Sequence, residues 1–471
     1  MNRLPRTLCQ TTSSVRGPFQ QHKREDAPTL STGKRPRAFV FNLRWEKILR
    51  NSRFKAVILA LTLTQMSEGM TQTALTWIAF RTGHNNLSLV ATIGFLQTLV
   101  PFLIILPGGF LADRLPSSPM LSGINLFKGF TYSLIPLFSL CGPVSVLNLE
   151  VIVILTAVLS SLFAPAFNAA LPTFVPSDAI KKANGWIQTF GQGGYLLGPL
   201  TAGGLLFYLK APWIILGAGI GFVLAAMILI VIPAMGPGLP APASPPDRVS
   251  PTLLPDEDPP GFRTAVREMV SFLKQKPSLV AGFLLIGLFG LINAPLPLLF
   301  PLMATQMFGM DKGFYTVLSS AYFLGPFFSG LIVIGSSRLP ALFLILSGYL
   351  LSGAALFGLS KSQSVWTGPT MLVLAGAGIS LTQPLVTEWF QQSIPRHFLG
   401  KAFSVSGFLF LIFCLVGIKG GTLLVQRYGL HPFLEGMGIS LCILAGVLLL
   451  ATQLSRKVFP KVTANPSLPD S

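Results

Sequence analysis

Long apolar runs alternate with short polar segments along most of this 471-residue chain. Within each run the apolar residues are continuous and do not alternate with polar ones, which argues against a membrane β-barrel. About 20 such residues span a bilayer as a helix. The pattern therefore predicts an all-α membrane protein with twelve transmembrane helices. The runs lie at residues 54–80, 87–112, 119–141, 148–170, 183–208, 212–235, 277–304, 313–335, 339–360, 365–388, 398–425 and 431–454.

Polar segments at both ends and near the middle of the chain divide these runs six and six. Residues 1–38 are rich in Pro, Ser, Thr and basic residues, which predicts disorder, and residues 39–50 predict a short interfacial helix. The central segment begins with many prolines and continues as GFRTAVREMVSFLKQK, an amphipathic pattern typical of a second interfacial helix. The predicted organisation is a basic cytoplasmic tail at 1–52, a six-helix bundle at 53–235, a cytoplasmic linker at 236–276, a six-helix bundle at 277–455 and a cytoplasmic tail at 456–471.

The composition and the placement of charge set the expected topology. Charged residues make up 11% of the chain, against about 25% in soluble domains, which excludes a water-soluble fold. With a cytoplasmic N-terminus, 27 of the 34 Lys and Arg residues lie inside, five lie outside, and Lys128 and Lys419 lie within runs. This positive-inside bias predicts that both termini are cytoplasmic. The basic loops would meet anionic lipid, so we expect membrane lipids as partners and no nucleic acid.

The chain lacks the motifs of metal, cofactor and nucleotide chemistry. Its four Cys residues have no ligand spacing, and no GxxxxGK[ST] phosphate-binding loop occurs. No nucleophile, base and orienting group form a recognisable catalytic set. We therefore expect no metal, no cofactor and no enzymatic activity.

Ionisable groups inside the runs are candidates for a functional site. Glu68 lies near the middle of the first run, where an ionised carboxylate costs about 2.5–3.5 kcal/mol of insertion free energy. It should face a cavity and is a candidate proton carrier; a neutral acid hydrogen-bonded to a neighbouring helix is the alternative. Gln65 and Gln72 lie within one turn and would line the same substrate cavity. Lys128 would also line this cavity and pair with Glu68 or Asp113. The alternative is that its side chain extends to the inner interface.

A glycine-rich stretch, GWIQTFGQGGYLLGPLTAGG, occupies the fifth run. Gly194 and Gly198 are four residues apart, a spacing that removes side chains from one helix face and lets a neighbouring backbone pack directly on it. Pro199 removes a backbone donor and favours a kink. The functional interpretation is a gating seam that includes Gly203, and ordinary helix packing is the alternative.

The seventh run contains three prolines in the stretch NAPLPLLFP. Prolines at this density interrupt a regular helix, and an interrupted transmembrane helix often marks a cavity or a gate. Asn293, at the start of this stretch, is the polar group expected to contact a substrate.

Three stretches resemble the major facilitator superfamily, and within it the branch of the enterobactin exporter and the macrolide efflux permeases. They are SEGMTQTALTWIAFRTG in the first run, LPGGFLADRL after the second, and FAPAFNAALPTFVPSDAIKKANG before the fifth. The resemblance implies a twelve-helix fold of two bundles with a central cavity between them. It also implies alternating access driven by an ion gradient, usually of protons. A weak internal repeat between the two halves of the chain agrees with a design of two parallel six-helix units.

The resemblance assigns roles to gating residues. The spacing of Gly194, Gly198 and Pro199 follows the antiporter signature of helix five, which accompanies export in the family. Gly109 with Asp113-Arg114 resembles the loop between helices two and three, where a charge pair favours one conformational state. An ordinary loop Asp-Arg pair is the alternative.

The chain also departs from the family pattern. The sequence LPSSP follows Arg114 in place of the usual Gly and basic pair. Asn125 stands where an acidic residue is expected three positions before Lys128, and Phe167 replaces a basic residue late in helix four. A non-transporting sensor or scaffold with the same fold is therefore one alternative.

The sequence as a whole predicts a secondary transporter. We expect proton-coupled efflux of an amphipathic small molecule, such as a drug or a siderophore, by a monomer in the cell (inner) membrane. Uptake or lysolipid transport is a further alternative. An organellar envelope is the alternative location if residues 1–38 are a transit peptide.

Overall fold

The structure of the chain is a computed structural model. The predicted linker, nearly all of the two predicted tails and both predicted interfacial helices lie outside the residues that it describes. The described residues are 52–114, 117–174, 180–232, 277–335, 340–362, 364–382, 384–387, 394 and 396–454.

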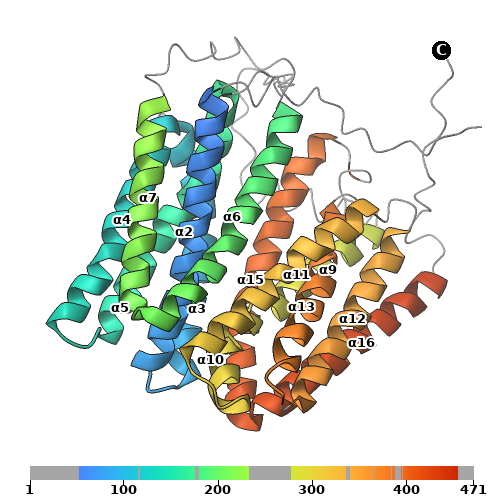
Figure 1. Cartoon of the computed structure of the whole chain (residues 1–471). Helices are drawn as coiled ribbons and strands as arrows, with labels where there is room; N and C mark the ends of the chain where they lie inside the picture. Colours follow the sequence, from blue (N-terminus) through green and yellow to red (C-terminus); the bar gives the residue numbers. More distant parts are fainter. Residues whose placement is uncertain are drawn as a thin grey trace, which may run out of the picture. The chain divides into compact units, whose positions relative to one another are not determined.

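All twelve predicted runs are helical, which confirms the prediction of an all-α fold with twelve transmembrane helices (Figure 1). The first six helices are α2 (Ser52–Thr82), α3 (Leu87–Arg114), α4 (Ser117–Cys141), α5 (Val146–Phe174), α6 (Ile180–Tyr208) and α7 (Ala211–Val231). The second six spans comprise α9 (Pro277–Asn293) with its continuation η4 (Leu296–Leu299), α10 (Phe300–Leu302) and η5 (Met303–Met307), then α11 (Lys312–Gly335), α12 (Ala341–Lys361), α13 (Thr367–Ser380), α15 (Arg396–Tyr428) and α16 (Leu430–Leu454).

Within the described part of the chain, nine of these spans are long and apolar enough to cross a membrane by themselves. The other three are α2, α6 and α11, and they contact one another. Each carries polar residues or glycine that face protein, for example Glu68 in α2, Gly198 in α6 and the buried Ser319 in α11. Their lower hydropathy therefore reflects a position among other helices, where polar groups avoid lipid.

Three helix pairings occur twice along the chain, although the close contact of α2 with α7 has no equivalent between α9 and α16 in the described part. In the first group of helices, α2 packs on α6, α3 on α5 and α4 on α7. In the second group the helices of the same rank pack together, α9 on α15, α11 on α13 and α12 on α16. Figure 1 shows the first group in blue to green and the second group in yellow to red. The two groups contact each other mainly through α6 with α11 and α3 with α15, again a pair of equivalent contacts.

Glycines bring the backbones of α2 and α6 into direct contact, as the spacing in the fifth run predicts. A Cβ atom placed on Gly198 would lie 2.6 Å from the Cα of Gly69, and one placed on Gly194 would lie 2.6 Å from the carbonyl oxygen of Thr62. No larger residue fits at these positions unless a backbone moves. The equivalent helices α9 and α15 also pack closely at a glycine, because Gly417 lies against the backbone of Leu291.

The seventh span is interrupted, as its prolines predict. The α-helix ends at Asn293, a 3-10 turn follows from Leu296 to Leu299, and a π-helical turn runs from Met303 to Met307. Each proline lacks the N–H that an α-helix needs, so the regular hydrogen-bond ladder cannot continue through this segment. The break places Asn293 at a helix end.

Candidate substrate cavity and buried ion pair

A cavity of about 260 Å³ lies where the two groups of helices meet, and we call it the central cavity. Its wall combines side chains from α2, α3 and α6 with side chains from α9, α11 and α15. The polar and aromatic members of the wall are Gln72, Thr73, Thr76, Gln97, Thr98, Tyr195, Asn293, Tyr315, Ser319, Phe323 and Phe410.

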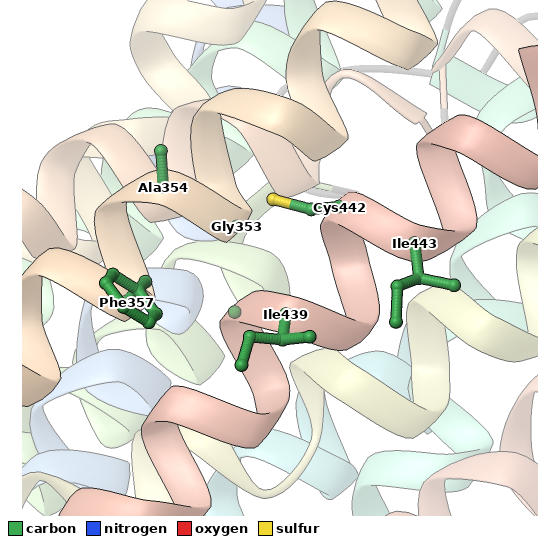
Figure 2. Close-up of a pocket in the computed structure, with 7 residues that line it drawn as sticks. Gly353, Ala354, Phe357, Ile439, Cys442 and Ile443 are labelled. Atoms are coloured by element: carbon green, nitrogen blue, oxygen red, sulfur yellow. The ribbon is translucent and has the colours of Figure 1, made fainter.

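Two larger hollows lie within the second group alone, and their chemistry differs. One, of about 450 Å³, lies between α12 and α16, where Phe357, Ile439 and Ile443 surround the crossing of Gly353 with Cys442 (Figure 2). The other, of about 580 Å³, lies among α9, α15 and α16 and is mostly apolar. Neither receives a side chain from the first group, so the central cavity is the one that relative motion of the groups would open or close.

Several hydroxyl groups in the wall of the central cavity are already bonded to the backbone. Thr73, Thr76 and Thr98 each donate to the carbonyl oxygen four residues earlier, over 2.8–3.0 Å. Tyr315 donates across the boundary between the groups to the carbonyl oxygen of Thr73, over 2.9 Å, and its ring stacks on Trp77 at 5.5 Å. The protons of these threonine hydroxyls are therefore engaged by the backbone.

The predicted substrate residues fall into two sets. Gln72 and Asn293 belong to the wall of the central cavity, and Tyr322 donates a hydrogen bond to Oδ1 of Asn293. Gln65 is half-buried and lies near Gly191 of α6, outside this wall. Lys128 also lies outside it. Their participation in substrate binding stays a prediction.

Glu68 and Lys128 form an ion pair inside the first group, with Nζ of Lys128 2.5 Å from Oε2 of Glu68. Ser160 of α5 donates to the other carboxylate oxygen over 3.3 Å, and the Lys128 ammonium lies 4.7 Å from the centre of the Phe222 ring. We call these four residues the charge cluster. Lys128 therefore pairs with Glu68 and does not extend to the interface, because 4% of its side chain is exposed.

The charge cluster lies one helical turn from the central cavity along α2. Glu68 and Gln72 are four residues apart and thus share one face of the helix, about 6 Å apart along its axis. A change of charge at Glu68 is therefore close enough to alter the position of a cavity side chain. This proximity is the geometry that coupling of a proton to a substrate requires.

Asn125 keeps a neutral side chain beside the charge cluster. It is fully buried, its Oδ1 accepts from Thr64 over 3.1 Å, and its Nδ2 donates to the carbonyl oxygen of Leu121 over 3.2 Å. An acid at this position would compete with Glu68 for Lys128. The departure from the family pattern at Asn125 thus leaves Glu68 as the partner of Lys128. Phe167, the second departure, is buried and stacks on Phe163 at 6.0 Å.

The predicted gating residues lie in two places. Gly109, Asp113 and Arg114 occupy the last turns of α3, and their side chains lie outside the described part of the structure. Their gating role stays a prediction. In α6, Gly194 and Gly198 face α2 of the same group, next to the buried Pro199.

Gly203 differs from the other glycines of α6, because it faces the second group. A Cβ atom placed on it would lie 2.9 Å from Cβ of Thr316 in α11. Nearby, Lys312 donates to the carbonyl oxygen of Leu209 over 3.3 Å. We call this the α6–α11 contact. It holds the two groups together at the C-terminal end of α6.

Several wall residues were not among the predicted site residues. Gln97 interrupts the second apolar run, in GFLQTLVP, and such an isolated amide is a usable signal. Tyr195, Tyr315 and Ser319 have no comparable signal, because hydroxyl-bearing residues are common in these runs and only the packing shows which ones meet.

Comparison with known proteins agrees with this architecture. Residues 57–421 match the model of the Major Facilitator Superfamily. Macrolide efflux protein A of Streptococcus pyogenes is 23% identical over 364 residues, which cover 76% of this chain and 85% of that protein. A protein of the same name from Enterococcus faecalis is 22% identical over 335 residues, which cover 70% of this chain and 98% of that one.

Solved structures share the fold at low identity. A bacterial homologue of the human lysosomal transporter Spinster, in an inward-facing and unoccupied conformation, superposes with a TM-score of 0.63 at 16% identity and covers 88% of this chain and 99% of its own. A POT family transporter superposes with a TM-score of 0.64 at 12% identity, covering 86% and 96%. The family match extends over most of the chain, and the chain therefore belongs to the major facilitator superfamily of multi-pass membrane transporters.

Proposed function

We propose that this secondary transporter exports an amphipathic small molecule in exchange for protons. The observation that carries the proposal is the buried pair of Glu68 and Lys128, one turn from a cavity that both groups of helices line. The names of the curated relatives, which are macrolide efflux proteins, support export of an amphipathic compound. The glycine spacing of α6, shared with the family's antiporter signature, supports the same direction.

The charge cluster supplies a mechanism for coupling. Protonation of Glu68 removes the negative charge and leaves the Lys128 ammonium without its partner. An uncompensated buried charge costs about 3–5 kcal/mol, and about 1.4 kcal/mol changes an equilibrium constant tenfold. The 30% exposure of Glu68 favours the lower end of that range. One proton is then sufficient to shift a two-state equilibrium by about a hundredfold.

In the proposed cycle, each of the predicted site residues has a role. Glu68 carries the proton, Gln72 and Asn293 contact the substrate, and Gln65 and Lys128 adjust their packing as the carboxyl group changes charge. The α6–α11 contact and the end of α3, with Gly109 and Asp113-Arg114, would open and close in alternation. The glycines of α6 allow such motion because no side chains interlock along its contact with α2.

The test begins with a strain that lacks its own exporters, grown with and without this protein on a panel of amphipathic drugs that includes macrolides. A compound to which the protein gives resistance is then followed in inside-out membrane vesicles with an acidic lumen. We expect accumulation that collapses when the proton gradient is removed. Glu68→Gln should reduce gradient-driven accumulation at least tenfold. Substrate exchange measured in the absence of a gradient should be unchanged in this variant.

Glu435→Gln is the matched control for this experiment. Glu435 also pairs with a lysine, Lys361, over 2.9 Å, but 60% of the lysine side chain is exposed. Loss of this pair should leave transport unchanged, because exposed pairs contribute little. Gradient-driven accumulation by Glu68→Gln at the wild-type rate would show that another group carries the proton. Accumulation only in right-side-out vesicles would show uptake in place of export.

A further inference from the structure

The wall of the central cavity presents neutral hydrogen-bonding groups that the protein does not use. Gln72 and Gln97 each carry a primary amide with two donors and an acceptor oxygen, and neither amide bonds to another residue in the described part of the chain. The amide of Asn293 receives a hydrogen bond from Tyr322 at its oxygen, so its NH2 group remains as a donor. Both glutamine side chains are partly exposed, so a ligand with complementary groups would take the place of water as their hydrogen-bond partner.

The wall carries no charged side chain among the residues that the structure describes. In the charge cluster, the only charges are those of Glu68 and Lys128, which compensate each other. An ion that entered the cavity would lose its hydration without gaining an opposite charge from the wall, since the neighbouring Lys419 is exposed and its ammonium lies over the Phe95 ring at 4.8 Å. The penalty for such burial amounts to several kcal/mol. A neutral ligand would not encounter this penalty.

Aromatic rings form the apolar part of the wall. Tyr195 meets Phe323 edge to face at 5.5 Å, and Tyr315 and Phe410 complete this part. The cavity volume of about 260 Å³ is close to the lower end of the usual range for ligand sites, about 300 Å³. A compact ligand, or a compact part of a larger one, fits such a space.

We propose that the central cavity selects an uncharged amphipathic molecule, whose hydroxyl, ester or amide groups pair with Gln72 and Gln97 while its apolar part packs on the aromatic rings. The inference rests on the proposed function for its place in transport. It concerns equilibrium binding alone, however, and so it is tested without a proton gradient.

The experiment uses three probes that share one uncharged boron-dipyrromethene fluorophore and differ only in a terminal hydroxyl, trimethylammonium or carboxylate group. Binding to the full-length protein in lipid nanodiscs is measured by fluorescence anisotropy. We expect the dissociation constant of the hydroxyl probe to be at least tenfold lower than those of the two charged probes. Gln72→Leu and Gln97→Leu should each weaken binding of the hydroxyl probe about threefold to tenfold, the effect of one hydrogen bond.

A charge-creating variant gives a second readout that does not depend on loss of binding. Gln97→Glu should strengthen binding of the trimethylammonium probe about tenfold and weaken binding of the carboxylate probe, because it places an anion in the wall. Gln426→Leu is the matched control, since Gln426 is exposed and lies outside the central cavity. It should leave all three affinities unchanged.

Three results would overturn the inference: equal or tighter binding of a charged probe to the wild-type protein, unchanged affinity in both leucine variants, or no saturable binding of any probe. None of these results bears on whether Glu68 couples transport to protons. Conversely, gradient-independent transport would contradict the proposed function and leave the selectivity of the cavity intact.

Discussion

Lys128 is more deeply buried than Glu68, with 4% of its side chain exposed against 30%. The two ends of this ion pair therefore respond differently to loss of the partner. If Glu68 becomes neutral, a buried ammonium remains, and its other contact among the described residues is with the Phe222 ring. If Lys128 is lost, the remaining carboxylate is partly exposed and accepts from Ser160. Loss of charge at Glu68 therefore leaves the more deeply buried partner, Lys128, without compensation, whereas loss of Lys128 leaves a partly exposed carboxylate.

This asymmetry predicts the stability of three variants. Glu68→Gln should lower the free energy of unfolding by about 3 kcal/mol, as for a broken buried pair, and Lys128→Met should lower it less. The double variant Glu68→Gln with Lys128→Met should recover most of the loss, because no charge is then buried. Thermal unfolding of the purified proteins in detergent measures all three. Additive losses in the double variant would contradict a direct interaction of the two side chains.

The sequence was sufficient to single out Glu68, because an acid in the middle of an apolar run has few structural roles. It was not sufficient to choose the partner of Lys128, since Glu68 and Asp113 are both distant from Lys128 in sequence. Only the structure, in which Lys128 of α4 reaches Glu68 of α2, resolves that choice in favour of Glu68. Gln97 could be recognised in the sequence as a polar residue in an apolar run. No spacing linked it to Gln72, however, so the sequence could not show that the two side chains line the same cavity.

At the scale of helices, α6 has different neighbours along its length. Gly194 and Gly198 contact the backbone of α2, whereas Gly203 contacts Thr316 of α11. The spacing of glycines in the sequence predicted close packing correctly but could not show which helix lies opposite each glycine. The result separates two functions within one helix, a fixed contact inside the first group and a contact between the groups.

Gly198→Ala tests the fixed contact. The added methyl group would lie 2.6 Å from atoms of the α2 backbone, so we expect a loss of about 1–3 kcal/mol in unfolding free energy, as for an overpacked core. Gly204→Ala is the matched control, because Gly204 is exposed and no atom lies within 4 Å of its added Cβ. The control should be neutral or slightly stabilising, since Ala favours helix over Gly. Equal melting temperatures for the two variants would contradict the close contact of α2 and α6.

At the scale of the whole molecule, the two groups of helices share a pattern of packing and meet through equivalent pairs. In the proposed cycle of alternating access, the α6–α11 contact separates. The fold could be predicted from the sequence because twelve apolar runs and three family-like stretches all indicate it. The conformational state, in which the two groups touch at Gly203, could not be predicted from the sequence. The same sequence pattern is compatible with contact and with separation at this residue.

A reversible cross-link tests this separation. Gly203→Cys with Thr316→Cys, in a chain whose four native cysteines are replaced by alanine, places two Cβ atoms about 2.9 Å apart before relaxation. A disulfide needs about 3.8 Å between these atoms, so the two helices must move apart by about 1 Å for the bond to form. Oxidation should abolish transport, and a reducing agent should restore it. Each single-cysteine variant serves as a control. Full transport by the oxidised, cross-linked protein would show that this contact stays closed throughout the cycle.

The repeated pairing of helices has a mechanical consequence. Three helix pairings recur in the two groups, yet among the described residues the buried ion pair belongs to α2 and α4, while the ion pair of the second group, Lys361 with Glu435, is exposed. In the proposed cycle, a proton that binds at Glu68 thus perturbs one half of the molecule directly. In that cycle the other half would receive the perturbation across the boundary, through the α6–α11 and α3–α15 contacts and through the bond of Tyr315 to Thr73 of α2, and it would follow as a passive body whose fold needs no internal change.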